Sequence, residues 1–547
     1  MKKMLVLLAV GCLMAQNSVI TEAKVPNSGD IGGQSLKNTQ DVENYLQRQK
    51  QTQQEKPQIA NKLPAEAGQD NSAQAIKFLV SSIVTDTSAI FSAQELNQLM
   101  AISEPHEMTL ADLYAVVSKI NAAYKQKGYP ASKAIIPQQN IKDGIVHLRL
   151  VEGRYGRFIV KNSKHWREKY IKDQLLIKPG ELVNAKKLEL ALLNFNTNNE
   201  ARLQAELTAG QDFGLTDCIL DVTEPKEWQG AVFTDNTNVD TSGKYRLGVQ
   251  VVNTNLGGNG ERIFLSPVWT KGTLSGLFSF DAPLGLGGTR FRTGYSRNRV
   301  KIIDGIYENL GIRGNSSDLY FGFTMPIDQS FNGNIQGFLT FHHKKSYSDI
   351  YDFVNYDTTS NTFDLGANFH RYDSRGGWYG ELSATLIKTN DNLQEDGGRT
   401  LRRFDLNLMR QQLLGHEQTL TFRFLGQTTN DKNLPVTEQI TLGGLYSMRG
   451  FPDSYVNGDS GYYTNLEYEF PLASRMGLRG ITFLDYGQVI NRYADVSLRR
   501  ELFSSGIGLV YNKHNIYGRL VWGFPLKTSG ELAKGNPRLH FYLQYGF

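Results

Sequence analysis

Apolar and polar side chains alternate along the second half of the chain, from Pro225 to Phe547. One clear run extends from Phe363 to His370, and another extends from Leu539 to Phe547, with an aromatic or aliphatic residue at every second position. Because successive side chains of a β-strand point to opposite faces, this period of two predicts strands with one apolar and one polar face. We count about sixteen such runs in residues 225–547.

The preceding segment, residues 73–224, predicts two small α/β domains in tandem. In the first, residues 73–153, Leu113, Val117 and Ile120 recur at the spacing of one helix face, and Gly128 follows as a C-terminal cap. Apolar runs around this helix predict a β-α-α-β-β order. Residues 154–224 repeat the same succession of strands and helices, so we expect a second domain there.

The first residues of the chain predict an export signal. Lys2 and Lys3 precede an apolar stretch and then small residues, which indicates a signal peptide over residues 1–23. Cleavage is expected after Ala23, with Ala15 as an alternative. Attachment of a lipid to Cys12 is disfavoured, because no leucine stands in the residues just before it.

A polar segment follows at residues 24–72 and is rich in Gln, Asn, Lys and Pro. Its middle part, from Asp41 to Lys56, predicts a short helix that ends before Pro57, and the rest predicts a linker. Few apolar residues lie on this helix, so it cannot fold independently. It either docks on another part of the protein or is a mobile tether.

Three features favour a membrane barrel over a soluble β-sandwich, which would show the same alternation. The number of strands is even and falls in the range of outer-membrane barrels. Short turns such as Gly257 to Gly260 alternate with long polar stretches such as Ser348 to Thr359 and Thr428 to Gly461. The chain also stops on Phe547, the last residue of a strand. Since lipid offers no hydrogen-bond partners, the sheet must close on itself. We therefore predict a mainly β fold, with a 16-stranded antiparallel transmembrane β-barrel over residues 225–547.

Composition excludes several other classes of protein. The mean hydropathy is −0.38 and no long apolar run follows the N-terminus, which argues against transmembrane helices. A net charge of +5 from 59 basic and 54 acidic residues gives no reason to expect a nucleic-acid partner. Cys218, alone once the signal is removed, excludes an intramolecular disulfide. No residues are spaced to bind a metal or cofactor, and no nucleophile with its base is evident, so we expect no enzymatic activity.

One long connection of the predicted barrel does not resemble an outer loop. Around Met448, Arg449, Gly450 and Phe451 it combines apolar side chains with turn-forming glycines, so we expect it to fold into the barrel.

The strand that follows this loop carries a carboxylate on its polar face. Alternation directs Leu484 and Tyr486 to the lipid, and it directs Phe483, Asp485 and Gly487 to the lumen. A carboxylate facing the lumen is a natural partner for the guanidinium of Arg449, in a charge-assisted and geometrically specific pair. The alternative is that Asp485 is one more polar residue of the lumen.

At these motifs the chain resembles the two-partner secretion transporters of TpsB type, which include haemolysin and filamentous-haemagglutinin secretion proteins within the BamA-like superfamily. The family's V-R-G-Y/F loop motif matches Met448, Arg449, Gly450 and Phe451, with Met in place of the commoner Val, and its F-x-D-x-G strand motif matches Phe483, Asp485 and Gly487. The Y-x-x-x-G-Y and V-E-G patterns of the family's POTRA domains match Tyr124, Gly128 and Tyr129, and Val151 to Gly153. The resemblance covers nearly the whole chain.

The resemblance implies a function. POTRA domains in the periplasm would recognise a secreted partner exoprotein of the haemolysin, adhesin or toxin class, and the barrel would export it across the outer membrane without ATP. The loop with Arg449 and the N-terminal helix would occupy the lumen at rest and be rearranged during transport. Further expected partners are outer-membrane lipid and the barrel-assembly machinery that inserts the barrel.

Two other functions stay open at this point. A BamA-like insertase would keep the loop motif, but such proteins typically carry more than two POTRA domains. A passive diffusion porin would lack the α/β domains before the barrel.

Overall fold

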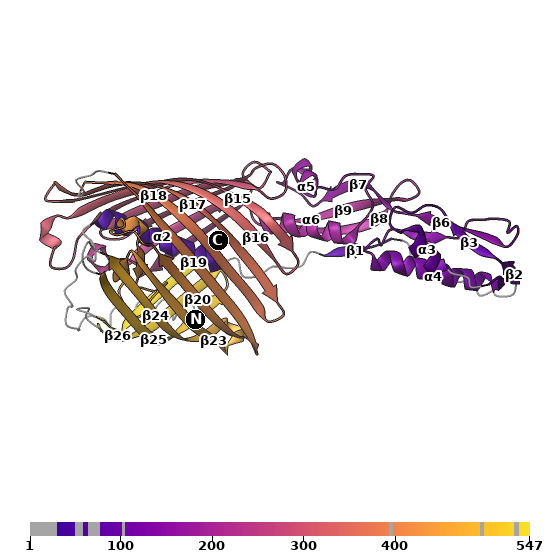
Figure 1. The fold of residues 1–547 in the computed structure, drawn as a ribbon. Helices are drawn as coiled ribbons and strands as arrows, with labels where there is room; N and C mark the ends of the chain where they lie inside the picture. Colours follow the sequence, from indigo (N-terminus) through magenta and orange to yellow (C-terminus); the bar gives the residue numbers. More distant parts are fainter. Residues whose placement is uncertain are drawn as a thin grey trace.

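The computed structural model describes residues 30–49, 58–63, 77–100, 104–392, 398–492, 497–529 and 535–547. Figure 1 shows a β-barrel and an elongated α/β region that extends from one end of it. The predicted signal peptide, residues 1–23, lies outside the described residues. So do residues 24–29, 50–57 and 64–72 of the predicted helix and linker, and residues 73–76 of the first predicted domain.

Sixteen antiparallel strands close into a barrel, which confirms the predicted fold class. In barrel order they are β10 (Trp228–Asp235), β11 (Arg246–Asn253), β12 (Arg262–Trp269), β13 (Thr273–Pro283), β14 (Arg290–Lys301), β15 (Arg313–Ser330), β16 (Gly333–Ile350), β17 (Phe353–Asp373), β18 (Gly376–Asp391), β19 (Gly398–Gly415), β20 (Gln418–Thr428), β23 (Ser460–Ala473), β24 (Leu478–Arg492), β25 (Ser497–Lys513), β26 (Ile516–Thr528) and β27 (Arg538–Gly546).

Strands β10 and β27 close the barrel. Their residues pair from Ala231 with Gly546 to Asp235 with Tyr542. The N–H of Phe547 donates to the carbonyl of Gly230 at 2.9 Å, and the N–H of Gly230 donates back at 3.1 Å. The last residue of the chain therefore takes part in the closing seam.

The alternation read from the sequence corresponds to the two faces of the barrel wall. Leu365 and Leu484 point outward and are 64% and 49% exposed. Their neighbours in the sequence turn inward: Phe483 and Asp485, on either side of Leu484, are 3% and 0% exposed. An outward apolar face suits lipid, and the inward polar face must find its partners inside the lumen.

One predicted loop is wrong. Residues 348–359 were expected to form a long outer loop, yet β16 and β17 continue through this segment and are joined by a turn at Tyr351 and Asp352. Both turn residues have positive φ, 49° and 64°, as a tight hairpin turn requires. Polar residues of this segment lie within the two strands, so their polarity does not indicate a loop.

The first α/β unit contains β2 (Lys77–Val80), β3 (Ser82–Thr85), α3 (Ala93–Met100), β4 (His106–Thr109), α4 (Leu110–Gln126), β5 (Lys133–Ile135) and β6 (Ile145–Val151). Helix α4 packs Leu113, Ile120 and Tyr124 into the core, as its spacing predicts. Thr109 caps it: the Thr109 hydroxyl accepts from the N–H of Asp112 at 3.2 Å, and the Asp112 carboxylate accepts from the N–H of Thr109 at 2.8 Å. Strand β4 was not predicted, because its four residues show no alternation.

The second unit contains β7 (Arg154–Lys161), α5 (Glu168–Gln174), α6 (Ala185–Asn198), β8 (Arg202–Ala209) and β9 (Leu215–Thr223). Its sheet gains a fourth strand from the linker: β1 (Ile59–Asn61) pairs in parallel with β8, Ile59 lying opposite Ala205. The side chains of α6 and β9 share one apolar core, in which Leu188, Leu192 and Cys218 are buried.

Hydrogen bonds attach this second unit to the end of the barrel. Asn255, in the turn after β11, donates to the carbonyl of His165 at 3.0 Å, and the N–H of Arg167 donates to the carbonyl of Gly258 at 2.9 Å. Arg290 at the start of β14 donates to the carbonyl of Asn198 at 2.9 Å. The α/β region is thus fixed at the end of the barrel that contains these turns.

The N-terminal helix is α2 (Ile31–Gln49), and it lies inside the barrel, where it contacts β14, β15 and β16 (Figure 1). The helix was predicted over Asp41 to Lys56. Its predicted start was wrong, because the helix begins ten residues earlier, at Ile31. Asp30 caps it by accepting from the N–H of Gly33 at 2.9 Å. The same carboxylate accepts from the hydroxyls of Ser346 and Ser348 at 2.5 and 3.2 Å. Contacts with the barrel wall, polar through Asp30 and apolar through Ile31, therefore hold the start of the helix.

In the part of the chain that the structure describes, no helix has the length and apolar character needed to cross a membrane.

The buried thiol of Cys218 gives a first prediction. Burial raises the pKa of this thiol to about 12, so the reactive thiolate is scarce in the folded protein at pH 8. In a Cys12→Ser background, we expect alkylation of folded protein at pH 8 to be at least about tenfold slower than alkylation of the guanidinium-unfolded chain. Equal rates in the two states would contradict the buried position.

Candidate functional site

The segment between β20 and β23, residues 429–459, is called here the inward loop. It contains a short 3-10 helix, η4 (Val436–Glu438), and the hairpin of β21 (Ile440–Leu442) and β22 (Val456–Gly458). Gly443 and Gly444 leave β21 with φ of 130° and 84°, which residues with a Cβ rarely adopt. Met448, Arg449 and Phe451 are 0–2% exposed, so the loop lies within the barrel rather than in solvent.

The structure brings together Arg449 and Asp485, the two charged residues singled out from the sequence. The guanidinium donates from Nε to Oδ2 at 2.8 Å and from Nη2 to Oδ1 at 2.6 Å, so the pair is bidentate. The backbone N–H of Arg449 also donates to Oδ2 at 3.0 Å. Asp485 therefore fixes both the side chain and the main chain of the loop at this residue.

Further residues of the wall complete the surroundings of Arg449. Its Nη1 donates to Glu467, which also accepts from Arg519. Asn465 donates to Asp485 at 2.8 Å and to the carbonyl of Ser447 at 2.6 Å. We call this set, Arg449 with Asn465, Glu467, Asp485 and Arg519, the arginine cluster.

The arginine cluster also rests on an aromatic ring. The Cζ atom of Arg449 lies 3.6 Å from the centroid of the Phe483 ring, a cation–π contact made with the first residue of the strand motif. The two motifs thus meet through Phe483 as well as through Asp485.

Sequence reasoning missed Glu467 and Arg519. Glu467 lies on the polar face of an alternating strand, so its inward direction could be predicted, but its register against the next strand could not. Register supplies this information: Glu467 is opposite Phe483 in the pairing of β23 with β24.

The other residues of the two motifs form the apolar contact between the loop and the wall. Met448 and Phe451 belong to an apolar cluster with Leu442, Val456 and Val489. A Cβ at Gly487 would come within 3.0 Å of the Met448 sulfur and 2.9 Å of Leu442 Cδ1, so glycine at the end of the strand motif leaves room for the loop.

Main chain contacts main chain where the loop meets β26. Gly450 has a φ of 94°, and a Cβ added to Gly523 would lie 2.4 Å from its nitrogen. The N–H of Gly450 donates to Nε2 of His540, on β27, at 3.0 Å. The loop is therefore held by β23, β24, β26 and β27, on one side of the lumen.

A second anchor holds another part of the loop to β16 and β19, on the opposite side of the wall. Glu438, fully buried at the end of η4, accepts from Lys344 of β16 and from Arg403 of β19, each at 2.7 Å. Nothing in the sequence spacing pointed to these residues, because they are far apart in the chain. The inward loop spans the lumen between two sets of buried ion pairs.

Helix α2 lies against the same loop. It contacts η4, and Gln34 donates to the carbonyl of Ser454 in the loop at 3.4 Å. Gln40 donates to Asp318 of β15 at 2.8 Å. Loop and helix together occupy the lumen.

A metal site is not formed by the described residues, among which no group of three or more His, Cys, Asp and Glu side chains could hold an ion. His342 and His343 have different hydrogen-bond partners. Nδ1 of His342 lies 2.9 Å from Oδ2 of Asp318, and Nδ1 of His343 lies 2.7 Å from Oδ1 of Asn361.

These features define a class of protein. A closed barrel of sixteen strands, preceded by two α/β units and containing an inward loop held by an arginine cluster, is the architecture of outer-membrane transporter barrels with POTRA domains.

Comparison with known families identifies the family within this class. The sequence profile of the family described as "Haemolysin secretion/activation protein ShlB/FhaC/HecB" matches residues 214–511, and that of "POTRA domain, ShlB-type" matches residues 78–153. The chain belongs to the haemolysin secretion/activation family, and it is an outer-membrane pore of a two-partner secretion system.

Individual relatives agree with this assignment. The heme/hemopexin transporter protein HuxB of Haemophilus influenzae is 23% identical over 399 residues, covering 70% of each chain. The outer membrane transporter CdiB of Escherichia coli is 23% identical over 501 residues, covering 86% of this chain and 82% of CdiB. The solved structure of CdiB from Escherichia coli has a TM-score of 0.70 at 19% identity and covers 96% of this chain and 100% of its own.

The contact of Gly450 with β26 gives a second prediction. Gly523→Ala places a methyl group against the loop main chain, and overpacking of this kind costs about 1–3 kcal/mol. We expect the variant barrel to unfold at a lower temperature, measured by the loss of heat-modifiable mobility on gels. Gly518→Ala on the same strand is the control, because its Cβ would meet nothing closer than 3.5 Å. Equal unfolding temperatures for the two variants would argue against close contact of the loop with β26.

Proposed function

We propose that the inward loop and helix α2 close the pore at rest and that a partner exoprotein displaces them during export. The observation that carries this proposal is the arginine cluster, which ties the loop to the wall by buried ion pairs beside the apolar contacts of Met448 and Phe451. Charged contacts of this kind can be exchanged for contacts with water when the lumen opens.

The α/β units are assigned to the periplasm in this proposal, where they receive the exoprotein. Their attachment to the turns after β11 and β13 places them at one end of the pore. In the first unit, β5 pairs with β6 alone among the described strands and lies at the edge of its sheet. An extended client can add a strand there by displacing Asn121, which accepts from the N–H of Ala134 at 2.7 Å. In the second unit, β1 occupies the free side of β8.

Transport of this kind needs no bond-breaking chemistry in the chain. Folding of the exoprotein outside the cell would prevent it from sliding back, so that no ATP is required. The names of two relatives bear on the kind of client. HuxB is described as a heme/hemopexin transporter and CdiB as an outer membrane transporter. We propose a secreted exoprotein as the client here.

The two alternative functions are less well supported. A diffusion porin needs an open lumen, but here the lumen holds the loop and α2. An insertase would be expected to carry more POTRA domains than the two α/β units between residues 77 and 223.

Removing either charge of the central pair tests the role of the inward loop. Arg449→Ala leaves the carboxylate of Asp485 without its cation, and Asp485→Ala leaves Arg449 with Glu467 as its remaining carboxylate. Breaking a buried ion pair by removing one partner costs about 3–5 kcal/mol. We expect secretion of the cognate exoprotein to fall at least about tenfold in both variants while the barrel still inserts. The measurement is exoprotein in the culture medium, normalised to heat-modifiable barrel in the outer membrane.

Asp373→Ala is the matched control for this experiment. It removes a wall carboxylate that accepts from Arg410 at 2.6 Å and does not contact the loop. Wild-type secretion by both Arg449→Ala and Asp485→Ala would refute the proposed role of the pair.

Deletion of residues 73–153 tests the role of the first α/β unit. Because the proposed docking strand β5 is lost while the barrel is untouched, we expect secretion to stop and the barrel to keep its heat-modifiable mobility. Exoprotein that still reached the medium would show that docking on this unit is dispensable and would favour a porin-like path.

A further inference from the structure

A cluster of cations interrupts the outward face of the barrel on β14 and its neighbours. Strand alternation directs Arg297, Arg299 and Lys301 of β14 outward, while Ser296, Asn298 and Val300 are buried. Across the ladder, Arg299 is opposite Leu274 of β13 and Asn315 of β15, and Lys301 is opposite Arg313. Lys345 of β16, opposite Ser317, is also exposed.

The cations lie directly beyond an apolar and aromatic band. Phe278, Tyr295 and Leu319 lie on the same strands, nearer the α/β units than the cations. They are 43%, 42% and 37% exposed. Tyr295 is opposite Phe278 on one side and Leu319 on the other. Aromatic bands mark the membrane interface of such barrels. An outward arginine or lysine costs about 2–4 kcal/mol at the bilayer midplane and about 0–1 near the interface, so this row belongs at the headgroup level.

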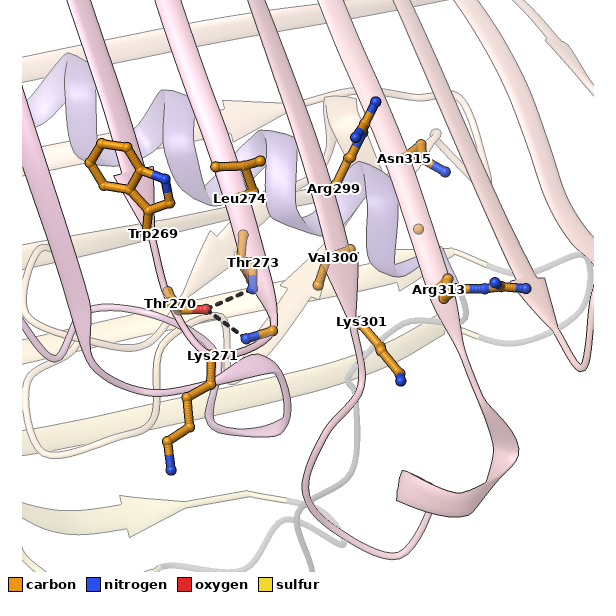
Figure 2. Close-up of a pocket in the computed structure, with 12 residues that line it drawn as sticks. Trp269, Thr270, Lys271, Thr273, Leu274, Arg299, Val300, Lys301, Arg313 and Asn315 are labelled. Carbon is orange, nitrogen blue, oxygen red and sulfur yellow. Dashed lines mark hydrogen bonds between the residues drawn. The ribbon is translucent and has the colours of Figure 1, made fainter.

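A cavity of about 380 Å³ lies among these cations. Its walls include Trp269, Lys271, Leu274, Arg299, Lys301 and Arg313, and none of the residues lining it is acidic. Figure 2 shows Trp269, Leu274, Arg299 and Asn315 side by side on neighbouring strands, with Lys271, Lys301 and Arg313 nearer the turns. Two carboxylates lie beside the cavity: Asp349 and Asp352 both pair with Arg313.

The position of these cations identifies the leaflet. Strand β14 starts at Arg290, which contacts the second α/β unit, and ends at Lys301. The cavity therefore lies at the end of the barrel away from the α/β units, and this step rests on the periplasmic orientation under the proposed function. The lipid there carries its phosphates on a saccharide headgroup.

We propose that this cavity binds a phosphate group of lipid A, the phosphorylated saccharolipid of the outer leaflet. Lys301 lies directly opposite Arg313, which Asp349 and Asp352 already pair with, so Lys271, Arg299 and Lys301 supply the positive charge that attracts an anion to the cavity. The guanidinium of Arg299 supplies the planar pair of donors that suits phosphate. Trp269 and Leu274 form the apolar side of the cavity, which faces the acyl chains and the sugar.

The test measures lipid binding to the purified full-length protein in detergent. The probe is bisphosphorylated lipid A, titrated and followed by native mass spectrometry. We expect Arg299→Gln/Lys301→Gln to weaken binding about tenfold or more, because two charge-assisted contacts are lost. Arg299→Gln alone, with a smaller loss expected, serves if the double variant does not insert as a heat-modifiable barrel.

The matched control is Lys388→Gln/Arg402→Gln. These two exposed cations lie toward the corresponding ends of β18 and β19 and do not line the cavity. Wild-type affinity of this control, together with the loss in Arg299→Gln/Lys301→Gln, is the result expected for a local site.

Three outcomes would overturn the proposal. One is equal affinity of the wild type and Arg299→Gln/Lys301→Gln for lipid A. A second is equally tight binding of phosphatidylglycerol, which would indicate a preference for any anionic lipid. A third is displacement of lipid A by millimolar inorganic phosphate, which would indicate a site for the free anion. None of these measurements uses the exoprotein, so failure here and failure of the proposed secretion function are distinguishable.

Discussion

Closure of the sheet is the constraint on which the rest of the structure depends. In lipid every backbone N–H and C=O must be paired within the protein, so β10 has to find β27, and even the last residue, Phe547, contributes hydrogen bonds to the seam. A closed sheet of sixteen strands encloses a lumen too wide for wall side chains alone to fill. The strand period makes its lining polar, and the contents of the lumen must satisfy those polar groups.

The inward loop meets this requirement with ion pairs at two points along it. Glu438 is held by Lys344 and Arg403, and Arg449 is held by Asp485 and Glu467. A buried ion pair adds little net stability compared with an apolar contact, but it is costly to break on one side only. Such pairs therefore give a loop a specific resting position without making that position overwhelmingly stable, which suits a part that has to move.

The sequence predicted the strands well because the period of two is a local property. It also identified which face of β24 carries Asp485, and the glycines and apolar residues of the loop indicated that the loop folds inward. The partners Glu467, Arg519, Lys344 and His540 could not be predicted, because register and barrel order decide which inward side chains meet. Helix α2 was placed ten residues too late for a related reason. Its start is set by Asp30 bonding to Ser346 and Ser348, a tertiary contact that its own sequence does not contain.

The positions of these contacts couple the helix to the loop. Strand β16 carries Ser346 and Ser348, which hold the start of α2, and it also carries Lys344, which holds Glu438 of the loop. Gln34 of the helix reaches the loop itself at Ser454. A shift of β16 or of the loop therefore weakens both sets of contacts, and removal of α2 withdraws one of the supports of the loop. Because these contacts share one strand, the helix and the loop are expected to leave the lumen together rather than independently.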